Sequence, residues 1–338
     1  MFFNKFTSEI MKNVFKKFEN KEILITGGAG FIGSQLAKKI IENVVQPKIT
    51  IFDSLKNQKK LSNGNKITLG NKSNLPVSDS VNYVDGDLSE PKDLDRLLEN
   101  DYDFIFHQAA ISDTTASEED NILYQKINVI SFEKFLEYAC KKNIPLVYAS
   151  SASVYGDLKS PQEVGNENPL NIYAKSKLKM EKLAHQFNEI YKPKTLIGLR
   201  YFNVYGPGET YKGSTSSMIL QLRNQILEGA EPSLFRDSDK IFRDFVYIDD
   251  VITANLLSSS TSFQGVLNVG SGEKRTFVEV AEILMNCLQI KKKIYYMENP
   301  YRNYQNDTCA NISKTKKILG FEPFYNLESG IDTYMKSF

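Results

Sequence analysis

The sequence TGGAGFIG at residues 26–33 lies between a short apolar run and a helical pattern. The apolar run is EILIT (22–26), and the helical pattern is FIGSQLAKKIIENVV (31–45). Gly27 permits a tight turn between them, and Gly33 lets the helix pack closely against the strand. A strand, a glycine turn and a helix in this order predict the first unit of a parallel sheet that is covered by helices.

Strand and helix patterns continue to alternate after this unit. Continuous apolar runs predict strands here, because the strands of a parallel sheet are buried on both faces. We therefore predict an α/β fold, a Rossmann-type doubly wound parallel sheet with a smaller α/β C-terminal substrate-binding region. The further predicted strands are KITIF (48–52), VNYVDGD (81–87), DFIFHQAA (103–110), PLVYASSASVYG (145–156, with its loop) and TLIGLRYFNVYG (195–206), and the further predicted helices are DLDRLLEN (93–100), INVISFEKFLEYACKKN (127–143) and residues 173–191.

Breaks in this alternation predict the organisation of the chain. Residues 1–20 form an N-terminal extension that is disordered, packed on the fold, or amphipathic at a membrane surface. Residues 21–206 form the dinucleotide-binding part, which a polar loop insertion interrupts at 54–80. We predict that residues 207–338 form mainly the substrate-binding region. The sequence leaves open whether part of this region returns to the sheet.

Composition and charge exclude several classes of protein. The 338 residues include 42 basic and 41 acidic side chains, so no bulk positive charge favours nucleic acid. No apolar run reaches the roughly 20 residues that span a bilayer, and the N-terminus lacks a signal-peptide core. Cys140, Cys287 and Cys309 fit neither a metal site nor a disulfide framework. We expect a cytoplasmic protein without metal, membrane or nucleic-acid partners.

The glycine turn also has the features of a dinucleotide site. Gly30 lets backbone N–H groups approach a pyrophosphate, which the helix N-terminus attracts. Asp53 ends the next strand, at the position that faces an adenosine ribose. An aspartate there favours NAD, whereas Lys56, Lys59 and Lys60 either neutralise the 2′-phosphate of NADP or form a solvated run. The choice between NAD and NADP stays open, with a preference for NADP.

A tyrosine and a lysine four residues apart, Tyr173 and Lys177, begin the helix after the fifth strand. One helical turn places them on the same face, at the sheet edge where ligands bind. Because a tyrosine pKa of about 10 makes a poor base at neutral pH, we expect Lys177 and a nicotinamide cation to lower it. Ser151 ends the fifth strand and is placed to hold a substrate oxygen. The alternative is that the pair belongs to a solvated, lysine-rich helix face.

Several motifs together resemble a known superfamily. The order of five stretches is that of extended short-chain dehydrogenase/reductases: TGGAGFIG (26–33), HQAA (107–110), YASSASVYG (148–156), YAKSK (173–177) and RYFNVYGP (200–207). Three stretches resemble the ADP-L-glycero-D-manno-heptose 6-epimerase family: AAISDTT (109–115), YFNVYGPGETYKGSTSSM (201–218) and LFRDSDKIFRDFVYIDDV (234–251). The resemblance implies epimerisation of an ADP-heptose at C6 with tightly bound NAD(P)+, in a homo-oligomer that serves lipopolysaccharide synthesis.

The resemblance also implies roles for individual residues. Tyr173 and Lys212 are the two acid/base groups, whereas Lys177 tunes Tyr173 and Ser151 assists it. Without the resemblance, Lys212 would be read as a solvated lysine in a Gly/Ser loop. The implied cofactor-binding residues are Gly27, Gly30, Phe31, Ile32, Gly33, Asp53, Ser54, Lys60, Asp87, Gln108, Ala109, Ala110, Ser112, Asn128, Lys177 and Val204. The implied substrate-binding residues are Ser112, Asn203, Ser214, Gln221, Phe235, Ser238, Arg243 and Tyr304.

Some of these residues keep an alternative interpretation. Arg243 is either a bidentate clamp on the ADP pyrophosphate or the ion-pair partner of Asp244 or Asp249. Asn128 lies either near the cofactor or in a helix-face hydrogen bond. Gln221 stands where the family is able to carry a substrate-contacting histidine, which leaves the fine contacts to the sugar and nucleotide open.

Three other functions compete with a heptose epimerase. A nucleotide-sugar (UDP-hexose) 4-epimerase would need Tyr173 but no role for Lys212. A 4,6-dehydratase would need an Asp-Glu pair directly after Ser151, where the sequence has Ala152 and Ser153. A non-catalytic NAD(P)-binding protein would often have lost the tyrosine or the lysine.

Overall fold

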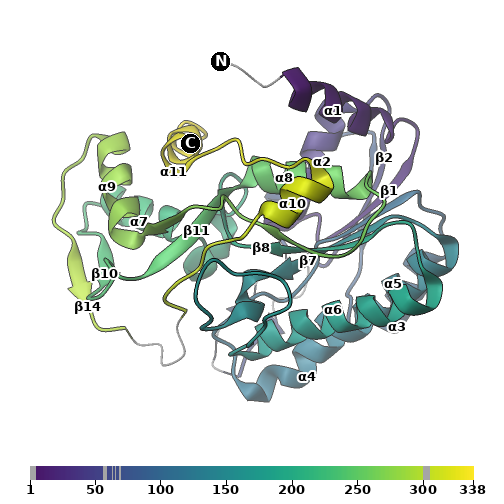
Figure 1. Ribbon diagram of the computed structural model, residues 1–338, viewed down its shortest axis with the longest axis horizontal. Coiled ribbons are helices and arrows are strands. Elements are labelled where there is room, and N and C mark those ends of the chain that lie inside the picture. The colour runs from purple at the N-terminus through teal and green to yellow at the C-terminus, as the bar shows by residue number, and fades with distance from the viewer. Residues whose placement is uncertain (1–4, 56–58, 63, 65, 68–69, 300–304) are drawn as a thin grey trace.

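The computed structural model describes residues 5–55, 59–62, 64, 66–67, 70–299 and 305–338. Its centre is a seven-stranded sheet in the order β12-β8-β7-β6-β1-β2-β5, and every neighbouring pair is parallel (Figure 1). This sheet confirms the predicted doubly wound α/β fold. Its strands are β1 (Glu22–Thr26), β2 (Lys48–Asp53), β5 (Val81–Asp85), β6 (Phe104–His107), β7 (Leu146–Ser151), β8 (Leu196–Tyr201) and β12 (Gln264–Val269).

The strand order reverses beside β1. The chain first builds outward on one side through β2 and β5, and then on the other side through β6, β7 and β8. At such a switch point, the connections after two adjacent strands leave in opposite directions and open a crevice beyond their carboxyl ends. The glycine turn follows β1, and residues 108–112 follow β6, so both reach this crevice.

Helices cover both faces of the sheet and bury two separate apolar clusters (Figure 1). One face carries α2 (Phe31–Asn43) and α8 (Ile248–Ser259), with α1 (Lys5–Lys16) and α10 (Ser313–Leu319) packed beside α8. The other face carries α3 (Pro91–Leu98), α4 (Asn121–Tyr124), α5 (Ser131–Lys142) and α6 (Ile172–Tyr191). Because both faces are covered, β8 is buried at every position.

The described part of the N-terminal extension packs on the fold. Val14 is buried at 4% exposure and Phe18 is fully buried. The Phe18 ring lies 4.7 Å from the ring of Phe104 in β6, between their centroids. Among the three alternatives predicted for residues 1–20, packing on the fold is therefore the one found for the described part. Residues 1–4 lie outside the described residues.

The helix predicted at 127–143 is in fact two elements. Residues Gln125–Ile130 form a π-helical turn, and α5 begins after it. The Asn128 side chain in this turn accepts a hydrogen bond from Ile111 N (2.9 Å) and donates to Ile111 O (3.0 Å) and to Ser176 Oγ (3.0 Å). The wider turn thus ties the loop after β6 to α6, and π-turns of this kind are often found near functional sites.

The insertion at 54–80 is more ordered than the predicted polar loop. It contains an antiparallel pair, β3 (Lys59–Lys60) and β4 (Lys66–Ile67), and a 3₁₀ turn at Lys72–Asn74. Asn71 N donates to Ala29 O (2.9 Å), and the Asn74 side chain donates to Gly208 O (2.9 Å). These contacts are long-range in sequence, so the insertion packs against both the glycine turn and the loop around Gly208.

The C-terminal region adds smaller elements and then rejoins the main sheet. One small sheet contains β9 (Asn203–Tyr205), β11 (Phe242–Tyr247) and β13 (Lys274–Thr276), and another pairs β10 (Ser233–Phe235) with β14 (Tyr295–Met297). The helices of this region are α7 (Met218–Leu227), α9 (Phe277–Leu288) and α11 (Leu327–Met335). Before α9, β12 returns to pair with β8, so the chain crosses between the two parts more than once.

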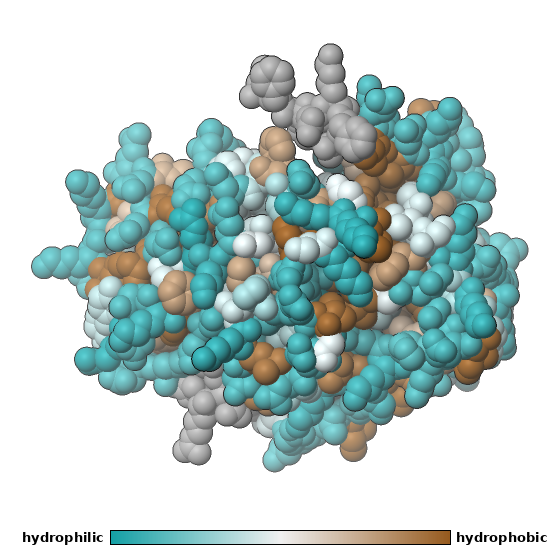
Figure 2. Space-filling view, in the orientation of Figure 1, coloured by the Kyte–Doolittle hydropathy of each residue, from teal (hydrophilic) through white to brown (hydrophobic). Residues whose placement is uncertain are grey.

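The surface is mainly hydrophilic on the face drawn in Figure 2, where hydrophobic residues form small separate patches. Within the part of the chain that the structure describes, no helix combines the length and apolarity that crossing a membrane requires.

Candidate active site

A cavity of about 280 Å³ opens at the switch point of the sheet. It lies where the glycine turn, the loop after β6, the end of β7, the start of α6 and the loop at 206–217 meet. The predicted residues that line it are Gly27, Gly30, Phe31, Ile32, Gly33, Asp53, Ser54, Asp87, Gln108, Ala109, Ala110, Ser112, Tyr173, Lys177, Lys212 and Ser214. Segments that are far apart in the sequence therefore converge on one cavity.

The glycine turn forms a cradle that side chains would fill. Gly27 has φ 72°, and a Cβ atom there would lie 2.7 Å from Ala109 N. A Cβ atom on Gly33 would overlap Gly27 O. The first turn of α2 presents N–H groups that the helix itself cannot satisfy, and its dipole favours negative charge. A narrow, donor-rich cradle of this kind fits the pyrophosphate of a dinucleotide.

Asp53 lies at the adenosine end of this cradle. Its carboxylate accepts hydrogen bonds from Ala29 N (2.8 Å) and Ser54 N (2.7 Å). Burial raises the pKa of Asp53 to about 6, although these hydrogen bonds oppose the shift. The group is thus held as an acceptor beside the cavity, which suits the hydroxyl groups of a ribose.

The tyrosine and lysine of the YAKSK segment are buried in the cavity wall. Tyr173 is 9% exposed and Lys177 is 2% exposed, whereas Lys175 is exposed and pairs with Glu118. Lys177 Nζ donates to Ala149 O at 2.7 Å, and Tyr173 is hydrogen-bonded to Ser151. A solvated helix face therefore does not describe Tyr173 and Lys177.

The expected lowering of the Tyr173 pKa is not found in the structure. Burial raises the pKa of Tyr173, and the hydrogen bond from Ser151 only reduces this effect. Burial also lowers the pKa of Lys177 to about 7, against the charge of Glu181. Because Lys177 is only partly charged at neutral pH, it stabilises a tyrosinate less than a full cation would.

Lys212 reaches the same cavity from a separate loop, which we call the Lys212 loop (residues 206–217). Glu209 is fully buried in this loop, and its carboxylate accepts hydrogen bonds from Gly206 N (3.2 Å), Ser217 N (2.6 Å) and Ser217 Oγ (2.8 Å). Lys212 Nζ lies 5.6 Å from the centroid of the Phe31 ring. Burial lowers the pKa of Lys212, and the charge of Glu209 opposes this. The loop thus holds a lysine over the glycine turn.

Other predicted residues do not line the cavity. Gln221 donates to Ser214 O (3.1 Å) and Ser216 O (2.8 Å), so it supports the Lys212 loop. Asn128 makes the structural hydrogen bonds described above, which lie behind the cavity wall. The remaining predicted residues outside the lining are Lys60, Ser151, Asn203, Val204, Phe235, Ser238 and Arg243, of which Ser151 adjoins the cavity through its hydrogen bond with Tyr173. Tyr304 and Lys56 lie outside the described residues.

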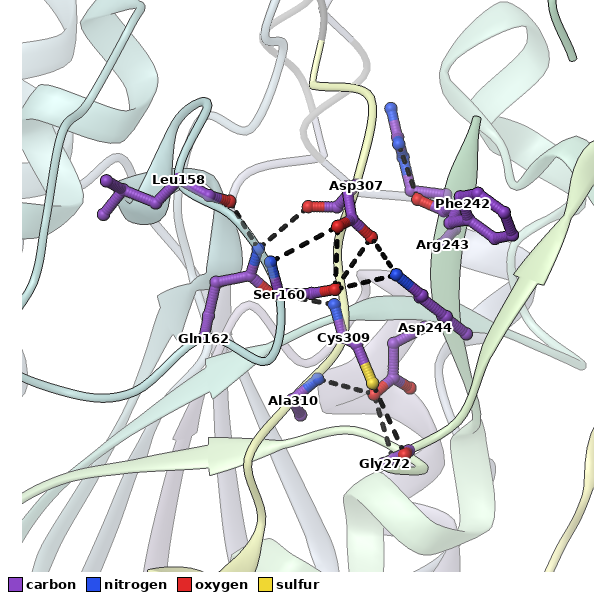
Figure 3. A network of polar contacts seen from close by, with 11 residues as sticks. Leu158, Ser160, Gln162, Phe242, Arg243, Asp244, Gly272, Asp307, Cys309 and Ala310 are labelled. Atoms are coloured by element: carbon purple, nitrogen blue, oxygen red, sulfur yellow. Dashed lines mark hydrogen bonds and ion pairs between the residues drawn. The ribbon is translucent and has the colours of Figure 1, made fainter. Parts of the chain in front are cut away.

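Arg243 is 6% exposed on β11, in the C-terminal region (Figure 3). Its guanidinium donates to Phe242 O (2.9 Å) and to Gln305 O, and it lies 5.5 Å from the centroid of the Phe277 ring. The neighbouring Asp244 carboxylate is fully buried and accepts hydrogen bonds from Ser271, Gly272 and Ala310. Both side chains thus engage the same C-terminal segment.

We call residues 305–311 the strap, because this segment joins two parts of the molecule (Figure 3). On one side, Ser160 Oγ donates to the Asp307 carboxylate at 2.8 Å, and Gln162 Nε2 donates to Asp307 O at 2.8 Å. On the other side, Lys274 Nζ donates to the same carboxylate at 2.8 Å. The strap therefore fixes β11, which carries Arg243, relative to the loop that follows β7.

Two polar residues near Lys212 were not predicted from the sequence. Glu209 holds the ends of the Lys212 loop, and Tyr211 lines the cavity with its hydroxyl 3.1 Å from Phe31 N. In the sequence, an acidic residue three positions before a lysine, in a Gly/Ser-rich segment, is a usable signal for Glu209. The sequence has no comparable signal for Tyr211, because its partner is 180 residues away.

The fold and the cavity together define an NAD(P)-binding α/β enzyme whose cavity at the switch point is lined by Tyr173, Lys177 and Lys212. The model of the NAD dependent epimerase/dehydratase family matches residues 23–270, and the chain belongs to this family. That membership confirms the resemblance to extended short-chain dehydrogenase/reductases.

Individual relatives are also similar along most of the chain. The ADP-L-glycero-D-manno-heptose-6-epimerase of Brachyspira hyodysenteriae is 36% identical over 323 residues, covering 92% of this chain and 96% of that protein. The crystal structure of the Helicobacter pylori enzyme of the same name has a TM-score of 0.86 at 40% identity, covering 95% of this chain and 97% of that one. The UDP-glucose 4-epimerase of Thermus thermophilus, in complex with NAD, has a TM-score of 0.78 at 25% identity, covering 93% and 98%.

Proposed function

We propose that this chain epimerises ADP-D-glycero-manno-heptose at C6 to the L-glycero form. The observation that carries the proposal is that Tyr173 and Lys212 line the same cavity, next to the glycine cradle. Inversion at an alcohol carbon requires a hydrogen to leave from one face and return to the other. Two acid/base groups on separate elements, α6 and the Lys212 loop, meet this requirement. The similarity to two heptose epimerases supports the choice of sugar.

The reaction divides the work between these residues. Bound NAD(P)+ supplies the hydride acceptor and donor. Tyr173 exchanges the C6 hydroxyl proton for one epimer, and Lys212 exchanges it for the other. Lys177 holds Tyr173 in place from the same helix, and Ser151 holds the substrate oxygen through its hydroxyl. Arg243 binds the pyrophosphate of the nucleotide sugar, since a planar guanidinium suits two phosphate oxygens.

The finer assignments are also proposals. The cofactor is NADP rather than NAD, and it is tightly bound because the reaction returns it unchanged. Lys59 and Lys60, which follow Asp53 in the insertion, support this choice, because their charges are able to neutralise a 2′-phosphate. Three free cysteines and the similarity to heptose epimerases support a cytoplasmic homo-oligomer in lipopolysaccharide synthesis. Binding of NADP+ and NAD+ measured side by side, and light scattering, test these two assignments.

The test of the function is proton NMR of the purified protein with ADP-D-glycero-β-D-manno-heptose. We expect the L-glycero epimer to form, and Lys212→Ala and Tyr173→Phe each to abolish its formation. The exposed Lys175→Ala is the matched control and should stay active. Failure to convert the heptose, with turnover of a UDP-hexose at C4 instead, would replace this proposal with a 4-epimerase. Full activity of Lys212→Ala would show that Lys212 is not the second acid/base group.

A further inference from the structure

Tyr211 precedes Lys212 and contacts the glycine turn directly. Its hydroxyl accepts a hydrogen bond of 3.1 Å from Phe31 N, the first N–H of helix α2. A Cβ atom on Gly30 would lie 3.6 Å from the same hydroxyl. The phenol therefore stands over the part of the cradle that a pyrophosphate approaches.

The hydroxyl of Tyr211 is also able to donate. Burial raises the pKa of Tyr211 to about 12, so the group keeps its proton at neutral pH. In the hydrogen bonds of the described residues, this hydroxyl acts only as an acceptor, from Phe31 N. Its own proton is therefore available for an acceptor from outside those residues, and a phosphate oxygen is such an acceptor.

The Lys212 loop is fixed well enough to hold this hydroxyl in place. Glu209 ties the two ends of the loop together, as described above. From outside, the Asn74 side chain donates to Gly208 O at 2.9 Å. Tyr211 is thus a direct contact between this loop and the first residue of α2 at the cofactor cradle.

We propose that Tyr211, whose hydroxyl is held by the hydrogen bond from Phe31 N–H, donates its own proton to the pyrophosphate of the dinucleotide, and so couples the Lys212 loop to the bound cofactor. The inference rests on the proposed cofactor site, but not on the identity of the sugar. It places a ligand of the cofactor on the same loop as the second acid/base group. Occupation of the cradle by the dinucleotide then fixes Lys212 in its catalytic position.

The test compares Tyr211→Phe with wild-type protein. The matched control is Tyr102→Phe, which removes another buried hydroxyl, one that donates to Leu97 O (3.1 Å) far from the cavity. Affinity for NADP+, NAD+ and ADP-ribose is measured by calorimetry on protein freed of cofactor, and the melting temperature is measured for each variant. We expect about a tenfold weaker affinity for all three ligands in Tyr211→Phe, since a hydrogen bond to a charged group is lost. Tyr102→Phe should bind like the wild type.

A second readout follows the loop. Hydrogen exchange of residues 206–217 should slow when NADP+ binds to the wild type, and this protection should be reduced in Tyr211→Phe at saturating NADP+. Equal or tighter binding by Tyr211→Phe overturns the proposal, because the hydroxyl would then be neutral or would compete with the phosphate. Unchanged loop protection in that variant overturns the coupling. Absence of dinucleotide binding in the wild type would instead overturn the proposed cofactor site itself.

Discussion

At the scale of single residues, burial decides how the candidate acid/base groups titrate. Tyr173, Lys177 and Lys212 all have pKa values shifted toward their neutral forms, because desolvation is the largest cause in each case. The neutral form of Lys212 is the one that accepts a proton. Burial thus moves the pKa of the two lysines toward neutral pH, where general acids and bases are efficient, and moves that of Tyr173 away from it.

The buried Lys177 predicts a specific dependence of stability on pH. Its pKa falls from 10.5 to about 7 on folding. Between these pH values the unfolded chain binds more protons, so this group makes the free energy of unfolding rise with pH, by up to about 1.4 kcal/mol per pH unit. We expect the difference in melting temperature between Lys177→Met and the wild type to favour the variant most below pH 7. This difference should become smaller as the pH rises toward 9.

Melting curves at pH 6, 7, 8 and 9 check this prediction. Lys175→Met is the control. Lys175 lies on the same helix as Lys177, but it is exposed and pairs with Glu118 at 2.7 Å. Its difference from the wild type should stay flat across this range. A flat difference for Lys177→Met as well would mean that Lys177 is not desolvated in the folded protein.

Which residues could be predicted depends on the range of their contacts. The sequence indicated Gly27, Gly33 and the Tyr173–Lys177 pair, because local spacing fixes their geometry. It did not indicate the raised pKa of Tyr173, which depends on burial by distant segments. Tyr211 was missed for the same reason, since its partner Phe31 belongs to another part of the chain.

At the scale of elements, the strap links the loop after β7 to the small sheet that contains β11 and β13. The Asp307 carboxylate accepts hydrogen bonds from Ser160, in the loop after β7, and from Lys274, in β13. The backbone oxygen of Gln305, also in the strap, accepts a hydrogen bond from Arg243. Displacement of the strap would therefore disturb Arg243 without touching Tyr173 or Lys212. Binding of the nucleotide end and the chemistry at C6 should respond separately.

Asp307→Asn tests this separation. It removes the charge that pairs with Lys274 at 2.8 Å while keeping the shape of the side chain. We expect the KM for the nucleotide sugar to rise about fivefold, corresponding to about 1 kcal/mol for a partly exposed ion pair, while kcat stays within about twofold. Steady-state kinetics measure both constants.

The control for this variant is Asp332→Asn, which breaks an exposed pair with Lys336. It should change neither constant. A fall in kcat at constant KM for Asp307→Asn would contradict the positioning role of the strap, because it would place the effect on the chemical step.

The six predicted strands with continuous apolar runs overlap β1, β2, β5, β6, β7 and β8, whereas β12 was left open as a return of part of the chain to the sheet. The π-turn at Gln125–Ile130 was not predicted. It depends on the hydrogen bonds between Asn128 and Ile111, and no local sequence pattern indicates them. The β3–β4 pair was also missed, since its strands of two residues lie in a polar segment. Short or distorted elements are set by tertiary contacts more than by their own sequence.

At the scale of the whole molecule, the segment that follows α1 belongs to the core. Phe18 is fully buried, and its ring centroid lies 4.7 Å from that of Phe104 and 6.1 Å from that of Phe106, both in β6. We expect Phe18→Ala to lower the free energy of unfolding by about 3–5 kcal/mol, because it leaves a cavity beside the central sheet. Urea denaturation measures this change.

Cofactor binding below the unfolding transition should be preserved in Phe18→Ala, since Phe18 does not line the cavity. The exposed Lys12→Ala serves as the control and should unfold like the wild type. A loss of stability below 1 kcal/mol would show that the segment around Phe18 is only loosely attached, contrary to its buried contacts.

The return of β12 has a consequence for incomplete chains. β12 pairs with the edge of β8, which is buried along its whole length. A chain that stops before residue 264 would leave β8 as an open edge, and such an edge recruits strands from other molecules. Interrupted translation or C-terminal proteolysis should therefore yield aggregates that quality control must clear, in place of a half-sized protein with partial activity.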